Sequence, residues 1–193
     1  MLVASSDVLA SVSETLRDRL TAGLSTLGPP APVAELHDLA SLPTSTPPRA
    51  TLFLYDVLEE PTSRNRPKTT ELVGGTVRVR KQPLGLCLHY MVTAWGGDRP
   101  TEQQILGRVL QVMYDDAVID GTELVGALAG TPTELRVSLA PMQLEDRARV
   151  WWAIGQPYRL SVNYEVRVVD IDAEISADAD PVLSRRVRAG LTS

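Results

Sequence analysis

Cys87, His89 and Met91 alternate along one stretch of the chain, and their side chains are soft or borderline ligands for a transition metal. On a strand they would project from the same face, but side chains two residues apart stand about 7 Å from one another. That spacing is too wide for a compact metal site unless ligands come from elsewhere. The second histidine, His37, belongs to a different segment. We therefore expect no metal site here.

Four acidic residues, Asp115, Asp116, Asp120 and Glu123, lie close together in the sequence. A calcium-binding loop places its carboxylates at alternating positions before a glycine, and this cluster does not follow that pattern. We interpret the cluster as a turn with helix caps.

Gly121 and Gly126 have the spacing of a phosphate-binding loop, but Ala127 and Leu128 stand where a lysine and a hydroxyl side chain must contact the phosphates and magnesium. We therefore expect no nucleotide site. The sequence also lacks the G-x-S-x-G, H-E-x-x-H, C-x-x-C and G-x-G-x-x-G motifs, and two histidines supply few general bases. We expect no catalytic residues and no cofactor, although carboxylate pairs leave a small enzyme as an alternative.

Length, composition and charge narrow the class of protein further. The 193 residues, 44% of them hydrophobic, suffice for one domain with a core. The single Cys87, the absence of a basic and then apolar leader, and the lack of an apolar run of about 18 residues predict a cytoplasmic protein that does not enter a membrane. A net charge of −5 argues against nucleic-acid binding.

One segment, residues 64–81, reverses this acidic balance. It carries a single acid, Glu71, against six basic residues. Such a segment either docks on an acidic protein surface, where charge complementarity sets register and association rate, or is a solvated loop that keeps the molecule soluble. The six basic residues are Arg64, Arg66, Lys68, Arg78, Arg80 and Lys81.

Hydrophobic periodicity predicts the elements that position these residues. Three- and four-residue apolar steps indicate helices, and β-rich or alternating runs indicate strands. The predicted class is α/β (α+β), with a mixed, largely antiparallel sheet flanked by helices, as a domain at 1–172 and a flexible arm at 173–193. We expect helices at 9–27, 101–113 and 144–154, strands at 33–39, 51–58, 84–95, 134–140 and 158–170, and a long loop at 59–83.

Two features of the last third predict contacts with other proteins. Trp151 and Trp152 are adjacent, so one of them is expected to point outward, and exposed tryptophan is common at interfaces. The strand at 158–170 alternates strictly, which indicates one apolar face and one wet or partner-facing side. That second side carries Arg159, Ser161, Asn163, Glu165 and Arg167.

Four stretches in the same order, covering about residues 5–172, resemble the cap or tail-terminator proteins of contractile injection systems of the antifeeding-prophage and virulence-cassette type. None is a catalytic motif. They are the helix starting at Val8-Leu9, the loop Arg64-Asn65-Arg66-Pro67, the run Leu88–Trp95 with the helix Gln104–Tyr114, and the segment Trp151–Val166.

The resemblance implies a tail-terminator-like domain that forms a hexameric ring on the last layer of inner tube and sheath, ends their growth and locks the extended sheath to the tube. Its partners would be its own copies, the sheath protein and the inner-tube protein, in a particle that assembles in the cytoplasm and can be released from it. A tail-completion or baseplate adaptor of the same machine is the alternative. Some larger family members have an additional C-terminal domain, and no function of that domain is inferred for this chain.

We expect an interface on two surfaces. The alternating strand, if it lies near a sheet edge, would accept an arm of a sheath subunit as an added strand. The basic segment would dock on the tube end or on neighbouring subunits. The expected interface residues are Arg64, Asn65, Arg66, Pro67, Lys68, Trp151, Trp152, Arg159, Asn163, Glu165 and Arg167.

Overall fold

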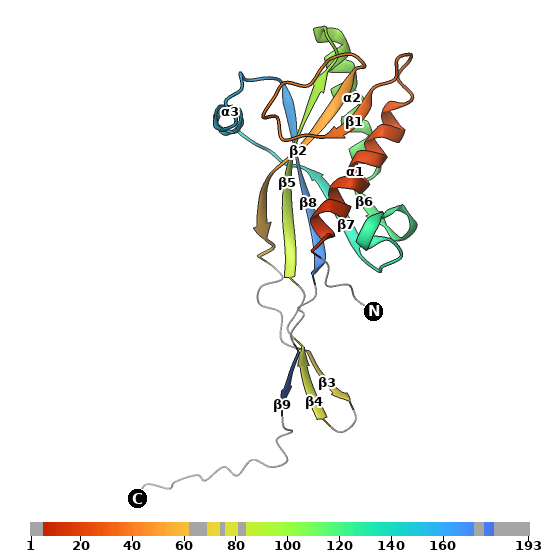
Figure 1. Ribbon diagram of the computed structural model, residues 1–193, viewed down its shortest axis with the longest axis vertical. Helices are drawn as coiled ribbons and strands as arrows, with labels where there is room; N and C mark the ends of the chain where they lie inside the picture. The colour runs from red at the N-terminus through yellow and green to blue at the C-terminus, as the bar shows by residue number, and fades with distance from the viewer. Residues whose placement is uncertain (1–5, 62–68, 74–75, 81–83, 172–175, 180–193) are drawn as a thin grey trace, which may run out of the picture.

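The computed structural model describes residues 6–61, 69–73, 76–80, 84–171 and 176–179 (Figure 1). This part contains three α-helices: α1 (Val8–Leu24), α2 (Arg99–Asp115) and α3 (Leu144–Ala153). Two 3₁₀ turns, η1 (Gly121–Glu123) and η2 (Gly126–Leu128), follow α2. None of the described helices is long and apolar enough to cross a membrane.

The strands form two sheets. Six strands build the main sheet, in the order β1-β2-β5-β8-β7-β6, and three build a smaller one, in the order β3-β4-β9. The main strands are β1 (Val33–Leu36), β2 (Arg49–Glu59), β5 (Leu84–Trp95), β6 (Val118–Asp120), β7 (Glu134–Leu139) and β8 (Ser161–Ile171). The small sheet consists of β3 (Thr69–Val73), β4 (Thr76–Arg80) and β9 (Ser176–Ala179).

The main sheet is mixed, because β1 runs parallel to β2 while all other neighbours are antiparallel. β8 pairs with β5 on one side and with β7 on the other, so it is an interior strand. β6 pairs with β7 only from Glu134 to Arg136. The second half of β7 therefore lies beyond the end of β6.

Helices α1 and α2 cover one face of the main sheet (Figure 1). The four-residue spacing of Val12, Leu16, Leu20 and Leu24 places them on one side of α1, and all four are fully buried. α2 starts at a capped end, where the Asp98 side chain accepts a hydrogen bond from the backbone N–H of Thr101 at 2.9 Å. The two helices and the sheet enclose the larger hydrophobic core.

A second side of α1 holds the loop that contains the two 3₁₀ turns. The Ser11 hydroxyl accepts a hydrogen bond from the backbone N–H of Ala127 at 2.9 Å, and the Thr15 hydroxyl accepts one from Val125 at 3.2 Å. Gly126 has a φ of +61°, and a Cβ there would lie 2.5 Å from the Ser11 Oγ. Close packing against α1 therefore requires a glycine at this position. This packing explains Gly126 without any role in binding a phosphate.

Helix α3 packs on the opposite face of the sheet and completes a smaller core. Alternate residues of β5 enter the two cores, Tyr90 and Val92 on the side of α1 and α2, and Met91 and Trp95 on the side of α3. Fully buried Trp151 is the residue by which α3 joins the second core.

The predicted class, with a mixed and largely antiparallel sheet flanked by helices, is confirmed. Two expectations need correction, and one short strand is additional. The stretch 59–83 contains the hairpin β3–β4 rather than only loop. The strand predicted at 158–170 is interior and not near an edge. The short strand β6 was not predicted at all. Within 173–193, which we expected to form an arm, residues 176–179 form β9 against β4.

Candidate interaction surfaces

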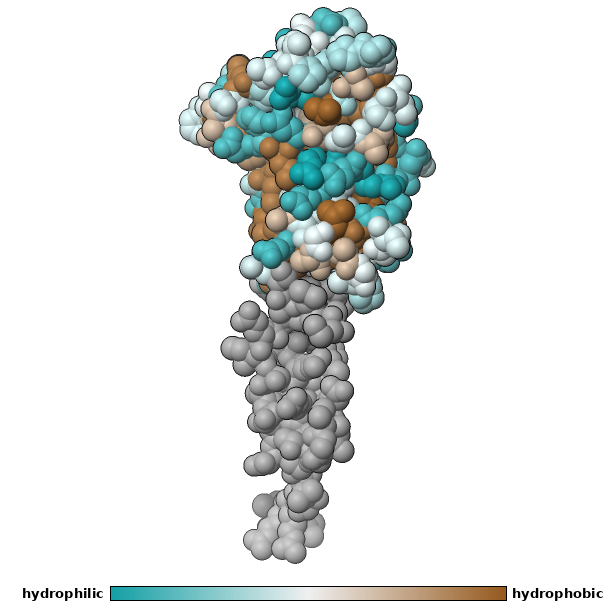
Figure 2. All heavy atoms as spheres, turned by 45° about the vertical axis from the view of Figure 1, so that its right-hand side comes forward, coloured by the Kyte–Doolittle hydropathy of each residue, from teal (hydrophilic) through white to brown (hydrophobic). Residues whose placement is uncertain are grey.

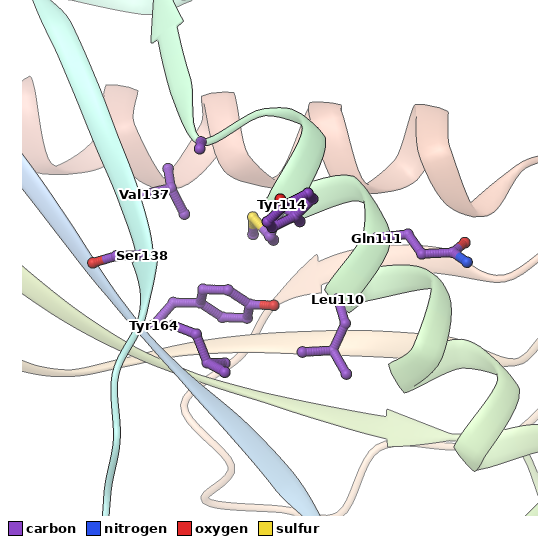
Figure 3. A pocket seen from close by; sticks show the side chains of 9 residues that line it. Leu110, Gln111, Tyr114, Val137, Ser138 and Tyr164 are labelled. Atoms are coloured by element: carbon purple, nitrogen blue, oxygen red, sulfur yellow. The ribbon is translucent and has the colours of Figure 1, made fainter.

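A groove of about 540 Å³ opens between α2 and β7 (Figure 3). Leu110 and Tyr114, one helical turn apart on α2, form one wall, and Tyr114 is 83% exposed. Leu139, at the end of β7, is also exposed and borders the opposite side. The lining is largely apolar and consists of Leu110, Gln111, Met113, Tyr114, Ala117, Val137, Ser138, Leu139 and Tyr164.

The rim of this groove is a sheet edge with backbone groups that point outward. The N–H of Ala140 donates to the carbonyl of Asn163, which makes Leu139 and Tyr164 a non-hydrogen-bonded pair of the antiparallel ladder. The N–H and C=O of Leu139 are therefore directed away from β8. β6 has ended by this point, and no other strand of the described ranges pairs with β7 here.

The Tyr164 side chain forms the floor of the groove, and its ring points toward Leu110 and Tyr114 (Figure 3). Only 3% of the residue is exposed, and its hydroxyl is buried with no hydrogen-bond partner among the described residues. Burial raises the pKa of Tyr164 to about 12, so the phenol is neutral at physiological pH. A buried hydroxyl in this position is able to donate to a group that enters the groove.

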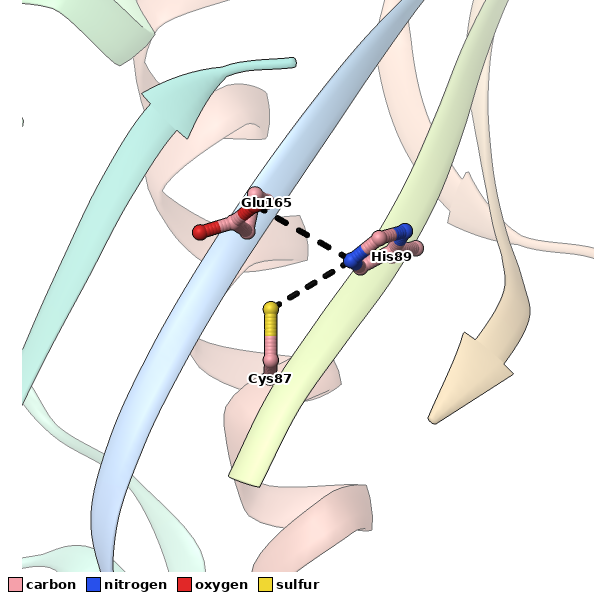
Figure 4. Close-up of side chains that lie close together, drawn as sticks. All are labelled: Cys87, His89 and Glu165. Atoms are coloured by element: carbon pink, nitrogen blue, oxygen red, sulfur yellow. Dashed lines mark hydrogen bonds and ion pairs between the residues drawn. The ribbon is translucent and has the colours of Figure 1, made fainter. Parts of the chain in front are cut away.

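On the opposite face of the sheet, Cys87 and His89 of β5 meet Glu165 of β8 (Figure 4). The Cys87 Sγ lies 3.3 Å from the His89 Nε2, which lies 4.0 Å from the Glu165 Oε2. Arg167 donates from Nε to the Glu165 Oε1 at 2.5 Å and lies 3.3 Å from a carboxylate oxygen of buried Glu60. Burial, followed by the charge of Glu165, raises the pKa of Cys87 to about 11, so the free thiol is not a nucleophile at neutral pH.

The two adjacent tryptophans are separated as the sequence predicts, since Trp152 is 82% exposed and Trp151 is fully buried. A helix cannot direct neighbouring residues to the same side. Trp151 packs in the core beneath α3 and presents no surface to a partner. Trp151 is therefore buried within this chain, whereas exposed Trp152 stays a predicted interface residue.

The polar side of β8, predicted to be wet or partner-facing, is exposed only in part. Ser161 and Asn163 are buried, because the indole of Trp151 donates to the Ser161 hydroxyl at 3.4 Å and the Asn163 amide donates to the Tyr55 hydroxyl at 3.2 Å. Asn163 is therefore engaged within the chain. Beyond it, Glu165 is partly exposed and Arg167 is exposed.

Arg159 lies just before β8 and is engaged within the chain. Its guanidinium is 4.2 Å from the centre of the Trp95 ring and forms an ion pair with Glu102 of α2. A cation over an aromatic face is attracted by the ring quadrupole. These contacts hold the start of β8 against α2, and a quarter of the side chain, 24%, stays exposed.

The expected interface residues Arg64, Asn65, Arg66, Pro67 and Lys68 lie outside the described residues.

Figure 2 turns the side of α1 and β6 forward and shows a mostly hydrophilic surface with small, separate hydrophobic patches.

Two of the four acidic residues after α2 form ion pairs, and the cluster lies in a turn where Asp116 is the C-cap of α2 and Asp120 precedes η1 without a side-chain cap hydrogen bond. Arg19 of α1 donates to Asp116, at the end of α2, at 2.5 and 2.9 Å, and to Glu123 at 2.8 Å. These pairs raise the pKa of Arg19, the Asp116 hydrogen bond most of all. The cluster thus ties α1 to the loop that follows α2.

Sequence reasoning missed the groove between α2 and β7. The helical pattern of α2 is apolar over a broad arc and therefore predicts that Leu110 is buried together with Ile105 and Val109. The sequence does contain one signal of the groove. Leu110 and Tyr114 are four residues apart at the edge of this apolar arc, so the apolar side of α2 is wider than the sheet surface that can cover it.

The comparisons with known proteins agree with one another. A family model described as the Pvc16 N-terminal domain matches residues 11–185. The chain is also similar to the sheath/tube terminator of PVC, an extracellular contractile injection system, solved in the extended state, with a TM-score of 0.63, 20% identity and 98% of this chain covered. For the tube-terminating cap of the anti-feeding prophage AFP, the TM-score is 0.58, with 20% identity and 97% of this chain covered.

The chain spans less than two thirds of these two structures, 65% of the first and 62% of the second. No curated protein sequence matches it significantly. The similarity therefore concerns the fold of this chain over nearly its full length.

Proposed function

Because this chain belongs to the Pvc16 N-terminal domain family, we propose that it caps a contractile injection system, where it terminates the inner tube and the sheath. The observation that carries this proposal is the similarity of nearly the whole chain to two solved proteins described as a sheath/tube terminator and a tube-terminating cap. The proposed role is structural and involves no catalysis. Assembly would take place in the cytoplasm, and the chain would remain on the particle after release.

The physics of a growing tube favours a closed ring as the terminator. Tube and sheath grow through a head-to-tail interface that never closes along the axis, so a terminator must match the growing end and offer no further copy of that interface. Around the axis, copies of the chain would close into a ring, which our proposal takes to be a hexamer. Each copy would then contact both the sheath and the tube.

We place the sheath contact at the groove between α2 and β7. A strand from a sheath subunit would pair with the outward N–H and C=O of Leu139, as extended segments do at exposed sheet edges. An apolar side chain of that strand would fill the groove against Leu110 and Tyr114. A carbonyl of the same strand would accept a hydrogen bond from Tyr164, whose buried hydroxyl otherwise lacks a partner among the described residues. The proposed site of strand addition is therefore β7, because β8 is an interior strand.

The other face of the molecule supplies the second proposed contact. Trp152 offers a large exposed apolar surface, and Arg159, Glu165 and Arg167 offer partly or fully exposed charged groups. The basic residues Arg64, Arg66 and Lys68, with Asn65 and Pro67, would dock on the tube end or on a neighbouring copy through charge complementarity.

Localisation on the particle tests the proposal directly. Particles would be assembled from the tube, sheath and baseplate proteins together with this chain, and an antibody against the chain, carried on gold, would be imaged by electron microscopy. We expect gold at one end of each extended particle, the end opposite the baseplate. Gold at the baseplate end would contradict the cap and support the adaptor alternative, while particles without gold would contradict both.

A further inference from the structure

Cys87, His89 and Glu165 bring three different metal-binding atoms together on the sheet face that carries α3 (Figure 4). The strand register explains how this happens. Cys87 and His89 are two residues apart on β5, so both project from the same face, and His89 is the direct cross-strand partner of Glu165 on β8. The two side chains of β5 bring their donor atoms to 3.3 Å from each other, closer than the spacing of the strand alone predicts, and β8 supplies a third ligand.

We propose that these three residues form a zinc site. Zinc takes thiolate, imidazole and carboxylate ligands, and the combination of one sulfur, one nitrogen and one oxygen suits it better than the harder cations magnesium and calcium. No feature of the groove contributes to this site, while Glu165 and Arg167 also belong to the second proposed contact, so zinc binding is tested on the free chain.

The distances between the three donor atoms agree with a tetrahedral ion. Bonds of about 2.0–2.3 Å at tetrahedral angles place ligand atoms about 3.3–3.8 Å from one another. The Cys87 Sγ and the His89 Nε2 are already 3.3 Å apart, the His89 Nε2 and the Glu165 Oε2 are 4.0 Å apart, and all three atoms lie within 4.8 Å. Side-chain rotations that move the donor atoms by roughly an ångström would complete the tetrahedral geometry.

The surroundings support the ligands and admit an ion. The Arg167 guanidinium occupies one carboxylate oxygen of Glu165, Oε1, and leaves Oε2 facing the histidine. Ligating carboxylates in metal sites are usually hydrogen-bonded in this manner. The side chains of His89 and Glu165 are 22% and 23% exposed, so an ion has access from solvent, and three protein ligands leave the fourth position for water. A bound ion would cross-link β5 and β8, the two central strands of the sheet.

Calorimetric titration of the untagged chain with zinc, after treatment with a chelator, tests the site. We expect one zinc per chain and a rise in the melting temperature with zinc concentration, because an ion that binds only the folded state stabilises it. Cobalt(II), used as a spectroscopic probe, is expected to give tetrahedral d–d bands and a thiolate-to-cobalt charge-transfer band. Absence of zinc binding, or a cobalt spectrum without the thiolate band, would overturn the proposal without any variant.

Variants assign the ligands. Cys87→Ser, His89→Gln and Glu165→Gln should each weaken zinc binding by at least about tenfold, the lower end of what even the supporting partners of metal ligands contribute. His37→Gln and Glu134→Gln alter the other histidine and an exposed carboxylate outside the cluster, and both should bind zinc as the unaltered chain does. Equal affinity in all five variants would contradict the assignment, and circular dichroism of each variant confirms that it is folded.

Discussion

Leu139 and Tyr164 stand directly opposite each other on β7 and β8 and border the same groove against α2. Because they form a non-hydrogen-bonded pair, the backbone of Leu139 faces outward where β6 has ended. The Tyr164 hydroxyl is buried in the groove without a partner among the described residues. One pair of residues therefore offers an incoming strand backbone groups, an apolar surface and a hydrogen-bond donor.

Proline at the edge of β7 tests strand addition. Leu139→Pro removes only an N–H that points away from the sheet, and edge strands tolerate proline there. We expect a folded protein whose thermal stability is close to that of the unaltered chain, but which retains much less sheath protein in co-sedimentation assays. Full retention of sheath would place its contact elsewhere.

The neighbouring residue is the matched control for that variant. Ser138 pairs with Glu165, and its N–H points toward β8. Ser138→Pro is expected to lose this bond and lower the free energy of unfolding by at least about 1 kcal/mol.

Leu110→Glu puts a charge into the groove without altering the edge, and it should weaken sheath retention while the fold persists.

Two buried tyrosines are expected to respond differently to loss of the hydroxyl. The Tyr90 hydroxyl is hydrogen-bonded to the Ser13 Oγ at 2.8 Å, whereas that of Tyr164 has no described partner. Tyr90→Phe should cost about 1 kcal/mol in urea unfolding, and Tyr164→Phe should be neutral or slightly stabilising. A cost for Tyr164→Phe equal to that of Tyr90→Phe would show that its hydroxyl is already satisfied in the free protein.

The same tyrosines predict a loss of stability in alkali. Burial raises the pKa of both Tyr90 and Tyr164 from 10.0 to about 12. Above pH 10 the unfolded chain loses these protons while the folded chain keeps them, so the free energy of unfolding falls as pH rises from 10 to 12. Below pH 10 their contribution is fully present. Urea midpoints measured across this range should fall less steeply in the Tyr90→Phe/Tyr164→Phe double variant, and an unchanged slope would contradict the assignment.

The two adjacent tryptophans form a further matched pair. Trp151→Ala leaves a large cavity in the core under α3 and should cost about 3–5 kcal/mol. Trp152→Ala removes a side chain that is 82% exposed, and the free energy of unfolding should change by less than about 0.5 kcal/mol. If Trp152 contacts a partner, its loss should instead reduce incorporation into particles, which quantitative blotting of purified particles measures.

Much of the fold can be predicted from local periodicity. A long helix or strand that is buried on one face or on both faces repeats its pattern of apolar residues many times. α1 shows five buried apolar residues at four-residue spacing, from Val8 to Leu24, and β5 carries apolar residues on both faces because helices lie on both sides. Strand β6 has only three residues, too few to carry a pattern of its own.

The role of β8 could not be predicted in the same way. Strict alternation indicates which residues share a face, but not whether the polar ones meet solvent. Ser161 and Asn163 are polar and buried, and Trp151 donates to the Ser161 hydroxyl while the Asn163 amide donates to the Tyr55 hydroxyl. Neighbouring strands also decide whether β8 is an edge, and that is a property of the whole sheet.

The candidate sites depend on tertiary register. Cys87 and His89 were recognised in the sequence as metal-binding residue types, but the cross-strand partner of His89 is set by the pairing of β5 with β8. The groove likewise exists because β6 ends before Val137, while β7 continues to Leu139. No local pattern encodes either relationship.

The length distribution of sheath–tube particles tests the central claim most directly. Tube, sheath and baseplate proteins would be produced with and without this chain, and extended particles measured by electron microscopy. The cap predicts particles of uniform length, closed at one end, when the chain is present, and ragged, overlong or contracted particles when it is absent. Identical distributions in the two preparations would contradict the proposed function.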